Sequence, residues 1–143
     1  MTFPRNNILV VDDEFNIAQT LTWVLQEAGY TAAFALSGQA ALEIASGIAV
    51  DLAIVDVALP DIDGIKIAAE ICHRLPKCKI LLISGDSECA PLLEAAKKDG
   101  IHFEVLPKPI PPSELLGKLE SLLQPPAFGP QMIVPLRRVP RPN

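Results

Sequence analysis

The sequence contains no long apolar segment, although hydrophobic residues make up 50% of its 143 residues. No stretch approaches the ~20 consecutive apolar residues that a helix needs to span a bilayer. The first apolar run is interrupted after four residues by Asp12, Asp13 and Glu14, which leaves too short a core for a signal peptide. We therefore expect a cytoplasmic protein that does not associate with membranes.

Cysteine and histidine are also scarce, with three and two residues respectively. The cysteines are odd in number and form no C-x-x-C pair, so we expect reduced, unreactive thiols rather than a disulfide framework. Neither His73 nor His102 has a neighbour at the spacing of a metal ligand, and both are expected at the surface. No glycine-rich loop follows the first apolar run, which argues against a P-loop or a dinucleotide site.

Acidic residues outnumber basic ones, and the basic residues are unevenly distributed along the chain. The net charge is −5, yet the tail 125–143 holds three arginines and no acidic residue. Residues 1–124 therefore carry nine basic and 17 acidic residues, a net charge of −8, which argues against binding of nucleic acid through its phosphates. Six of the nineteen tail residues are proline, so we expect the tail to be disordered or extended.

Short apolar runs alternate with amphipathic segments through most of the chain. Five runs have the length and composition of buried strands: 8–11, 32–36, 52–55, 80–83 and 103–106. The segments that follow them have helical periodicity: about 17–28, 38–48, 65–75, 91–98 and 113–123. Gly29 should end the first helix, and Ser37 and Ser113 should cap the second and the last. This alternation predicts an α/β fold with a parallel sheet covered on both faces.

Four of the predicted strands are followed closely by polar side chains. These are Asp12 and Asp13 after the first strand, Asp56 after the third, Ser84 after the fourth and Lys108 after the fifth. Because the carboxyl ends of parallel strands meet at one edge of the sheet, these side chains should converge there. Three carboxylates in one pocket are costly unless a cation shares it, and Mg²⁺ is a hard ion that prefers such oxygens.

The stretch D-L-A-I-V-D-V-A-L-P-D-I-D-G carries Asp56 at the end of its strand. Pro60 fixes φ, Asp61 and Asp63 suit turn positions, and Gly64 permits a positive φ before the next helix. Alone, Asp56 would be better explained as a cap or turn carboxylate. The convergence of the other polar residues favours a functional site instead.

Four motifs together resemble the receiver domain of two-component response regulators. They are V-V-D-D-E, D-V-x-L-P-x-x-D-G, the I-S-G that ends the fourth strand and the final K-P, in this order over about residues 6–124. The resemblance implies a flavodoxin-like (βα)5 doubly wound parallel sheet with strand order 2-1-3-4-5. It places the receiver domain at 1–124 and a proline-rich basic tail at 125–143.

The resemblance also implies a role for each residue of the site. Asp56 would be the phosphoacceptor. Asp13, Asp56 and the backbone carbonyl of Ala58 would ligate Mg²⁺ or Mn²⁺, and Asp12 would assist through water. Lys108 would contact the phosphoryl oxygens as a point charge, and the lysine–proline bond that follows it is expected to be cis. The simpler alternatives are that Asp12 and Asp13 only cap the helix that follows them and that Lys108 is an ordinary surface lysine.

A switch is implied as well. Ser84 would donate its hydroxyl to the phosphoryl group, although a serine bonded only to backbone is the simpler explanation. The family couples this hydroxyl to an aromatic residue three positions before the lysine, where this sequence has Val105. Phe103 lies two residues earlier and on the same expected face, so either it substitutes or the coupling differs. We expect the helix at 91–98 and the fifth strand to respond.

By resemblance the protein is a signalling receiver, not an enzyme beyond its own phosphorylation and dephosphorylation. Its expected partners are a histidine kinase or phosphotransfer protein, and a separate output protein that binds the fourth helix, fifth strand and fifth helix. A homodimer on phosphorylation is a further hypothesis.

One alternative function is a phosphorylation-independent binding module, which Val105 favours slightly. Another is a phosphatase-like enzyme with an aspartyl nucleophile, which Glu14 disfavours because it replaces the second aspartate of the D-x-D pattern.

Overall fold

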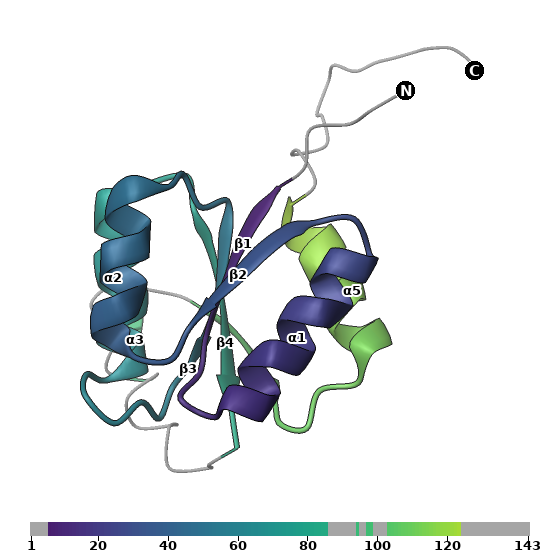
Figure 1. Ribbon diagram of the computed structural model, residues 1–143. Helices are drawn as coiled ribbons and strands as arrows, with labels where there is room; N and C mark the ends of the chain where they lie inside the picture. Colours follow the sequence, from purple (N-terminus) through teal and green to yellow (C-terminus); the bar gives the residue numbers. More distant parts are fainter. Residues whose placement is uncertain (1–5, 86–93, 95–96, 99–102, 124–143) are drawn as a thin grey trace.

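A five-stranded parallel sheet forms the centre of the computed structural model, which describes residues 6–85, 94, 97–98 and 103–123 (Figure 1). The strands are β1 (Asn7–Val11), β2 (Thr31–Ala35), β3 (Leu52–Asp56), β4 (Lys79–Ser84) and β5 (Glu104–Pro107). Their order is β2-β1-β3-β4-β5, and all neighbouring pairs are parallel. The structure thus confirms the predicted sheet and its strand order.

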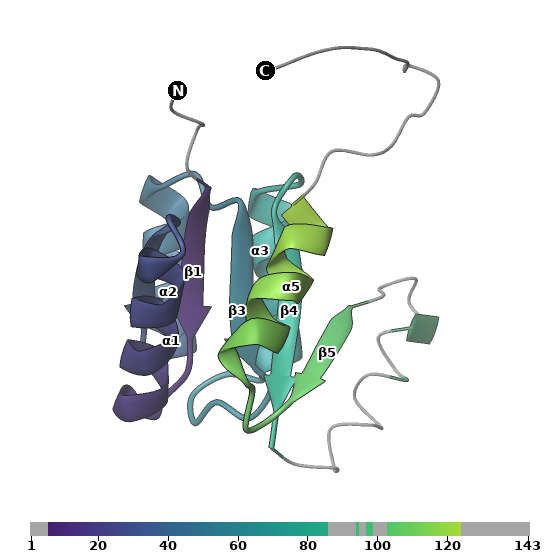
Figure 2. The same ribbon diagram turned by 90° about the vertical axis from the view of Figure 1, so that its right-hand side faces the viewer.

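Helices cover both faces of this sheet. They are α1 (Phe15–Glu27), α2 (Gly38–Gly47), α3 (Gly64–Arg74) and α5 (Pro112–Leu123). α1 and α5 lie on one face, and α2 and α3 lie on the other (Figures 1 and 2). Most of the predicted helix 91–98 and the whole tail 125–143 lie outside the described residues. No helix in the described ranges combines the length and hydropathy that crossing a membrane requires.

The strands alternate their side chains between two hydrophobic clusters. Leu9, Val11 and Val55 belong to the cluster under α2 and α3, whereas Val10 and Ile54 belong to the cluster under α1 and α5. Because both faces are buried, the strands read as continuous apolar runs rather than as alternating ones. All five residues of β3 are buried, so this central strand holds its last residue, Asp56, in a fixed position.

Two predicted helix boundaries are confirmed in detail. Gly29 follows α1 with a φ of 101°, a left-handed conformation that suits glycine. The hydroxyl oxygen of Ser37 accepts a hydrogen bond from the Ala40 N–H at 3.1 Å and so caps α2. Among the described residues, the other helix and strand boundaries agree with the predicted ones to within about two residues.

Two local features differ from the simplest expectation. Gly64 does not use the positive φ that glycine permits, and it is the first residue of α3. Glycine is needed here because the backbone approaches closely: a Cβ at position 64 would lie 2.7 Å from the Val57 Cα and against the carbonyl oxygen of Asp56. Ser113 does not cap the last helix, because α5 begins one residue earlier at Pro112, whose fixed φ suits the first helical position.

Candidate functional site

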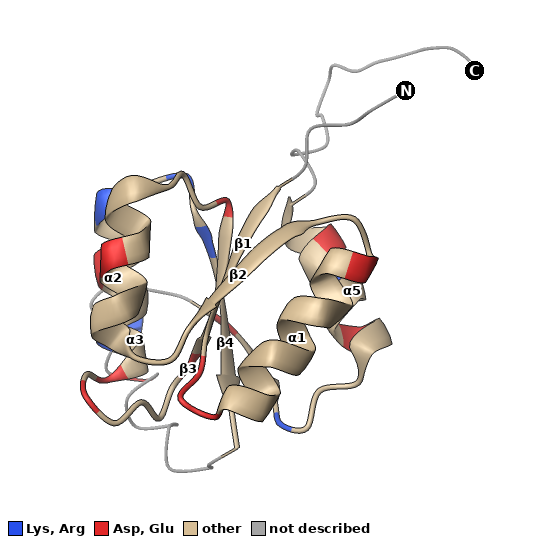
Figure 3. Cartoon of the chain, in the orientation of Figure 1, with Lys and Arg blue, Asp and Glu red and all other residues tan. Residues whose placement is uncertain are grey.

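The polar residues that follow the strands do converge at one edge of the sheet. The Nζ atom of Lys108 lies 2.9 Å from Oδ2 of Asp12 and 3.0 Å from Oδ2 of Asp56. It also lies 3.5 Å from Oε1 of Glu14. Figure 3 shows the acidic positions gathered where β1 and β3 end, with a basic position of the loop before α5 close by. Lys108, which is distant in sequence, thus pairs with carboxylates that follow β1 and end β3.

Lys108 is held in place by its backbone as well as by its charge. Its N–H donates a hydrogen bond to the carbonyl of Ser84 at 2.9 Å, which ties the end of β5 to the end of β4. The peptide bond between Lys108 and Pro109 is cis, as predicted. The side chain is 16% exposed, so the ammonium faces the carboxylates rather than bulk water.

Asp12, Asp13 and Asp56 form a carboxylate cluster. Each offers an oxygen atom, and these atoms all lie within 4.8 Å of one another. Asp12 and Asp56 are 0% and 4% exposed, whereas Asp13 is exposed. A single ammonium does not balance three neighbouring carboxylates, and oxygen-only ligands are those that Mg²⁺ and Mn²⁺ prefer. The residues present therefore fit a hard divalent cation.

The two buried carboxylates are oriented by backbone amides. Oδ1 of Asp12 accepts a hydrogen bond from the N–H of Glu14 at 2.9 Å, and Oδ1 of Asp56 accepts one from the N–H of Ala58 at 3.0 Å. Each side chain thus presents its other oxygen to Lys108. An open cavity of about 260 Å³ lies beside them and is lined by Asp13, Glu14, Asp56, Ala58, Gly85 and Lys108.

Burial and charge shift the pKa values of this site. Burial raises the pKa of Asp56 above its ordinary value of 3.8, and the hydrogen bonds from Lys108 and Ala58 offset part of that shift. The neighbouring carboxylate of Asp12 raises it further. Burial acts to lower the pKa of Lys108, but its bonds to Asp12 and Asp56 outweigh this, and the pKa is raised. Lys108 is therefore a permanent cation at any physiological pH.

The loop between β3 and α3 is fixed at both of its ends. The N–H of Val57 donates to the carbonyl of Ile83 at 2.9 Å, and the N–H of Gly64 donates to the carbonyl of Val57 at 3.0 Å. Asp63 caps α3 by accepting the Ile65 N–H at 2.8 Å. The close approach of Gly64 to Asp56 brings the start of α3 directly under the site.

The predicted switch residues occupy the places expected of them in the fold, although their roles remain predictions. Ser84 is 8% exposed and ends β4. Phe103 and Val105 both pack against the cluster under α2 and α3, so they share one face as predicted.

Two contacts of the site could not be anticipated from the sequence. The carboxylate of Glu14 faces Lys108, although the sequence analysis predicts no role for Glu14 in the site. The carboxylate of Asp61 accepts hydrogen bonds from the N–H groups of Gly38 and Gln39, both at 3.0 Å. Asp61 was predicted only as a turn residue, and no local signal points to a helix more than twenty positions away.

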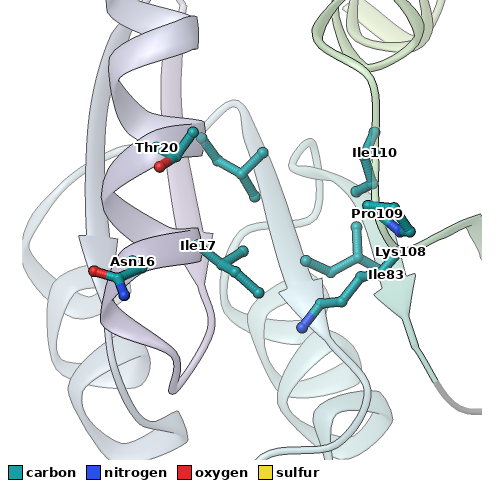
Figure 4. A pocket seen from close by; sticks show the side chains of 8 residues that line it. Asn16, Ile17, Thr20, Ile83, Lys108, Pro109 and Ile110 are labelled. Carbon is teal, nitrogen blue, oxygen red and sulfur yellow. The ribbon is translucent and has the colours of Figure 1, made fainter.

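A second, apolar cavity of about 510 Å³ adjoins the site on the α1 side. Figure 4 shows that its lining comes from α1 and from the residues around Lys108; it includes Ile17, Thr20, Ile83, Pro109 and Ile110. Lys108 borders both cavities. A partner that binds in the apolar cavity would therefore lie next to the carboxylate cluster.

Comparison with known proteins gives consistent results. A family model described as the response regulator receiver domain matches residues 8–120. The alkaline phosphatase synthesis transcriptional regulatory protein PhoP of Bacillus subtilis is 31% identical over 123 residues, which cover 84% of this chain and 49% of that protein. The transcriptional regulatory protein ZraR of Escherichia coli is 33% identical over 123 residues, which cover 86% of this chain and 27% of that protein. The chain thus spans half the length of these relatives or less.

Solved structures of response regulators resemble this chain in fold and in sequence. The response regulator TrrA from Thermotoga maritima, in complex with Mg²⁺ and BeF, is 35% identical with a TM-score of 0.72, and the match covers 82% of this chain and 99% of that one. The chemotaxis protein CheY4 of Vibrio cholerae is 28% identical with a TM-score of 0.75, covering 84% of this chain and all of that one.

Proposed function

Because the chain belongs to the response regulator receiver domain family of two-component signalling, we propose that Asp56 accepts a phosphoryl group from a phosphohistidine on a partner protein. The observation that carries this proposal is the placement of Asp56. It ends the fully buried central strand, is one of three clustered carboxylates and lies 3.0 Å from the Lys108 ammonium. Receiver domains interact with histidine kinases, and such a kinase or a phosphotransfer protein is the proposed donor.

The transfer exchanges one bond for another. The bond between phosphorus and the histidine nitrogen breaks, its electron pair stays with the imidazole, and a carboxylate oxygen of Asp56 bonds to phosphorus. The incoming group carries negative charge, and the fixed Lys108 ammonium reduces its repulsion by the carboxylates. The amide of Ala58 orients the Asp56 carboxylate for this attack.

Asp13, Asp56 and the backbone carbonyl of Ala58 would hold Mg²⁺ or Mn²⁺, with Asp12 assisting through water. When bound, the ion offsets the charge of the transferring phosphoryl group. The oxygen-only cluster supports this assignment, as does the TrrA structure, whose description includes Mg²⁺ and BeF. The buried carboxylates would otherwise depend on Lys108 alone for compensation.

Ser84 would donate its hydroxyl to the phosphoryl group and so transmit the modification, with Val105 or Phe103 responding on β5. The proposed output face consists of the predicted helix 91–98, β5 and α5, and would bind a separate protein or a second copy of the chain. Residues 1–124 are proposed to form the receiver and 125–143 an extended tail, in a cytoplasmic, phosphorylated protein. Beyond its own phosphorylation and dephosphorylation, no catalysis is proposed.

The alternative hypothesis of a binding module that works without phosphorylation is not favoured. The family of the chain is a phosphoacceptor family, and Asp12, Asp13, Asp56, Ser84 and Lys108 are all present at the sheet edge. In a module that had lost phosphorylation, we would expect at least one of these residues to be replaced.

The test is intact-mass analysis after incubation with acetyl phosphate, with and without Mg²⁺. We expect one phosphoryl adduct on the parent that requires Mg²⁺, and none on Asp56→Asn. Asp51→Asn is the matched control, because Asp51 lies just before the other end of the same strand, where it accepts the Asn7 N–H. An adduct on Asp56→Asn would contradict the proposal. So would the absence of any adduct on the parent together with a failure to bind beryllofluoride.

A further inference from the structure

The carboxylate of Asp61 joins the β3–α3 loop to the start of α2. Oδ1 accepts a hydrogen bond from the N–H of Gly38, and Oδ2 accepts one from the N–H of Gln39, each at 3.0 Å. The third N–H of this helix, that of Ala40, is already bonded to the Ser37 hydroxyl. Two side chains therefore share one helix terminus, one from the adjoining residue and one from a loop 22 or 23 residues away.

The loop is fixed near both of its ends. Its first residues are fixed through the Val57 and Ala58 amides, and its last through the Asp63 cap. Between these points Leu59 and Ile62 are partly buried against the cluster under α2 and α3, whereas Pro60 and Asp61 are exposed. The hydrogen bonds that Asp61 accepts add a polar attachment of this segment to α2, a helix that itself packs on α3.

The close approach of α2 makes this tie possible. A Cβ at Gly38 would lie 2.7 Å from the Ile67 Cδ1 and 3.3 Å from the Ile62 Cβ. A larger residue would crowd the side chains of Ile67 and Ile62, so the glycine allows the start of α2 to lie close to α3 and the loop. A carboxylate also suits this position because its charge is favourable near the amino end of a helix. In agreement, its bonds to Gly38 and Gln39 lower the pKa of Asp61.

We propose that Asp61 is a positioning residue for the divalent-cation site, which it serves by holding the loop that carries Ala58 against the amino end of α2. The inference rests on the proposed function, in which the Ala58 carbonyl is a ligand of the ion. Asp61 itself touches neither the ion nor the phosphoacceptor. Its effect reaches the site through the three residues that separate it from Ala58.

The experiment compares Mn²⁺ affinity, measured by electron paramagnetic resonance of the free ion, in the parent, Asp61→Ala and Ser37→Ala. Ser37→Ala is a matched control, since it removes a cap from the same helix without touching the loop. Thermal unfolding of each variant reports the stability lost with the cap. Both variants should unfold at a lower temperature than the parent.

Only Asp61→Ala should lose Mn²⁺ affinity, by about tenfold, as for other residues that orient metal ligands. Equal affinities of Asp61→Ala and the parent would overturn the inference and leave the proposed function intact. An equal loss in Ser37→Ala would also overturn it, since the effect would then follow helix stability. If the parent binds no Mn²⁺, the metal site of the proposed function fails, and this inference fails with it. Should Asp61→Ala not fold, Asp61→Asn decides by the same criteria, since it keeps the shape and loses the charge.

Discussion

The Nζ atom of Lys108 lies 3.0 Å from Oδ2 of Asp56, across 52 residues of sequence. It also pairs with the fully buried Asp12 at 2.9 Å, so a single ammonium compensates two carboxylates that have left water. The site should therefore respond both to loss of the Lys108 charge and to addition of a divalent cation.

Removal of the Lys108 charge should destabilise the protein when no divalent ion is present. We expect Lys108→Ala to lower the free energy of unfolding by about 1–3 kcal/mol in EDTA, because two buried carboxylates lose their partner. The control is Lys118→Ala, whose pair with Glu104 is solvent-exposed and should contribute less than about 1 kcal/mol. Urea unfolding measures both values. Equal losses in the two variants would contradict the role given to Lys108.

Addition of Mg²⁺ should stabilise the folded state. At a free concentration of about 100 times the dissociation constant, the gain in unfolding free energy is about 2.7 kcal/mol. Thermal unfolding in Mg²⁺ and in EDTA measures it. Asp13→Asn should abolish most of the gain and Asp51→Asn should retain it, because only Asp13 belongs to the carboxylate cluster. A full gain in Asp13→Asn would place the ion elsewhere.

A side chain at Gly64 should be poorly tolerated. Its Cβ would collide with backbone atoms of Asp56 and Val57, which cannot move without disturbing the central strand. We expect Gly64→Ala to cost about 1–3 kcal/mol of stability. Gly117→Ala, within α5 with no atom near its Cβ position, should instead stabilise by about 0.5–1 kcal/mol. Chemical denaturation compares the two, and a stabilised Gly64→Ala variant would show that this contact is absent in solution.

Two aspartates close in sequence should titrate in opposite directions from the ordinary value of 3.8. The pKa of Asp56 is raised by burial, so the folded state binds its proton first, and its contribution to stability falls as pH rises through that window. The pKa of Asp61 is lowered by the amides of Gly38 and Gln39, so its contribution is present above 3.8 and lost as pH falls through the lower value. Carboxyl ¹³C NMR in EDTA should show this order, and its reversal would refute it.

The hydroxyl of Ser84 should be needed for the response but not for the modification. Ser84→Ala should still form the adduct with acetyl phosphate, while the NMR shift changes of Val105 and Phe103 on addition of beryllofluoride should shrink. Ser84→Thr keeps the hydroxyl and should respond as the parent does. A full response in Ser84→Ala would remove this serine from the proposed switch.

The five strand and helix pairs could be predicted from sequence, and the structure confirms all of them except the helix at 91–98, most of which lies outside the described residues. Apolar periodicity is a local property, so buried strands such as 52–55 are recognisable without knowledge of their neighbours. The sequence also determined that Asp12, Asp56, Ser84 and Lys108 gather at one edge, because parallel strands with right-handed crossovers leave no other arrangement.

Which of these groups are in contact depends on how the elements pack together. The contact of Lys108 with Glu14, the tie from Asp61 to α2 and the packing of Gly64 against Asp56 each join residues with no local relationship in the chain. For this reason Gly64 does not adopt the positive φ that glycine permits. Its backbone could have adopted either conformation, and the close approach of α3 to the end of β3, which is a property of packing and not of the turn, selected the helical one.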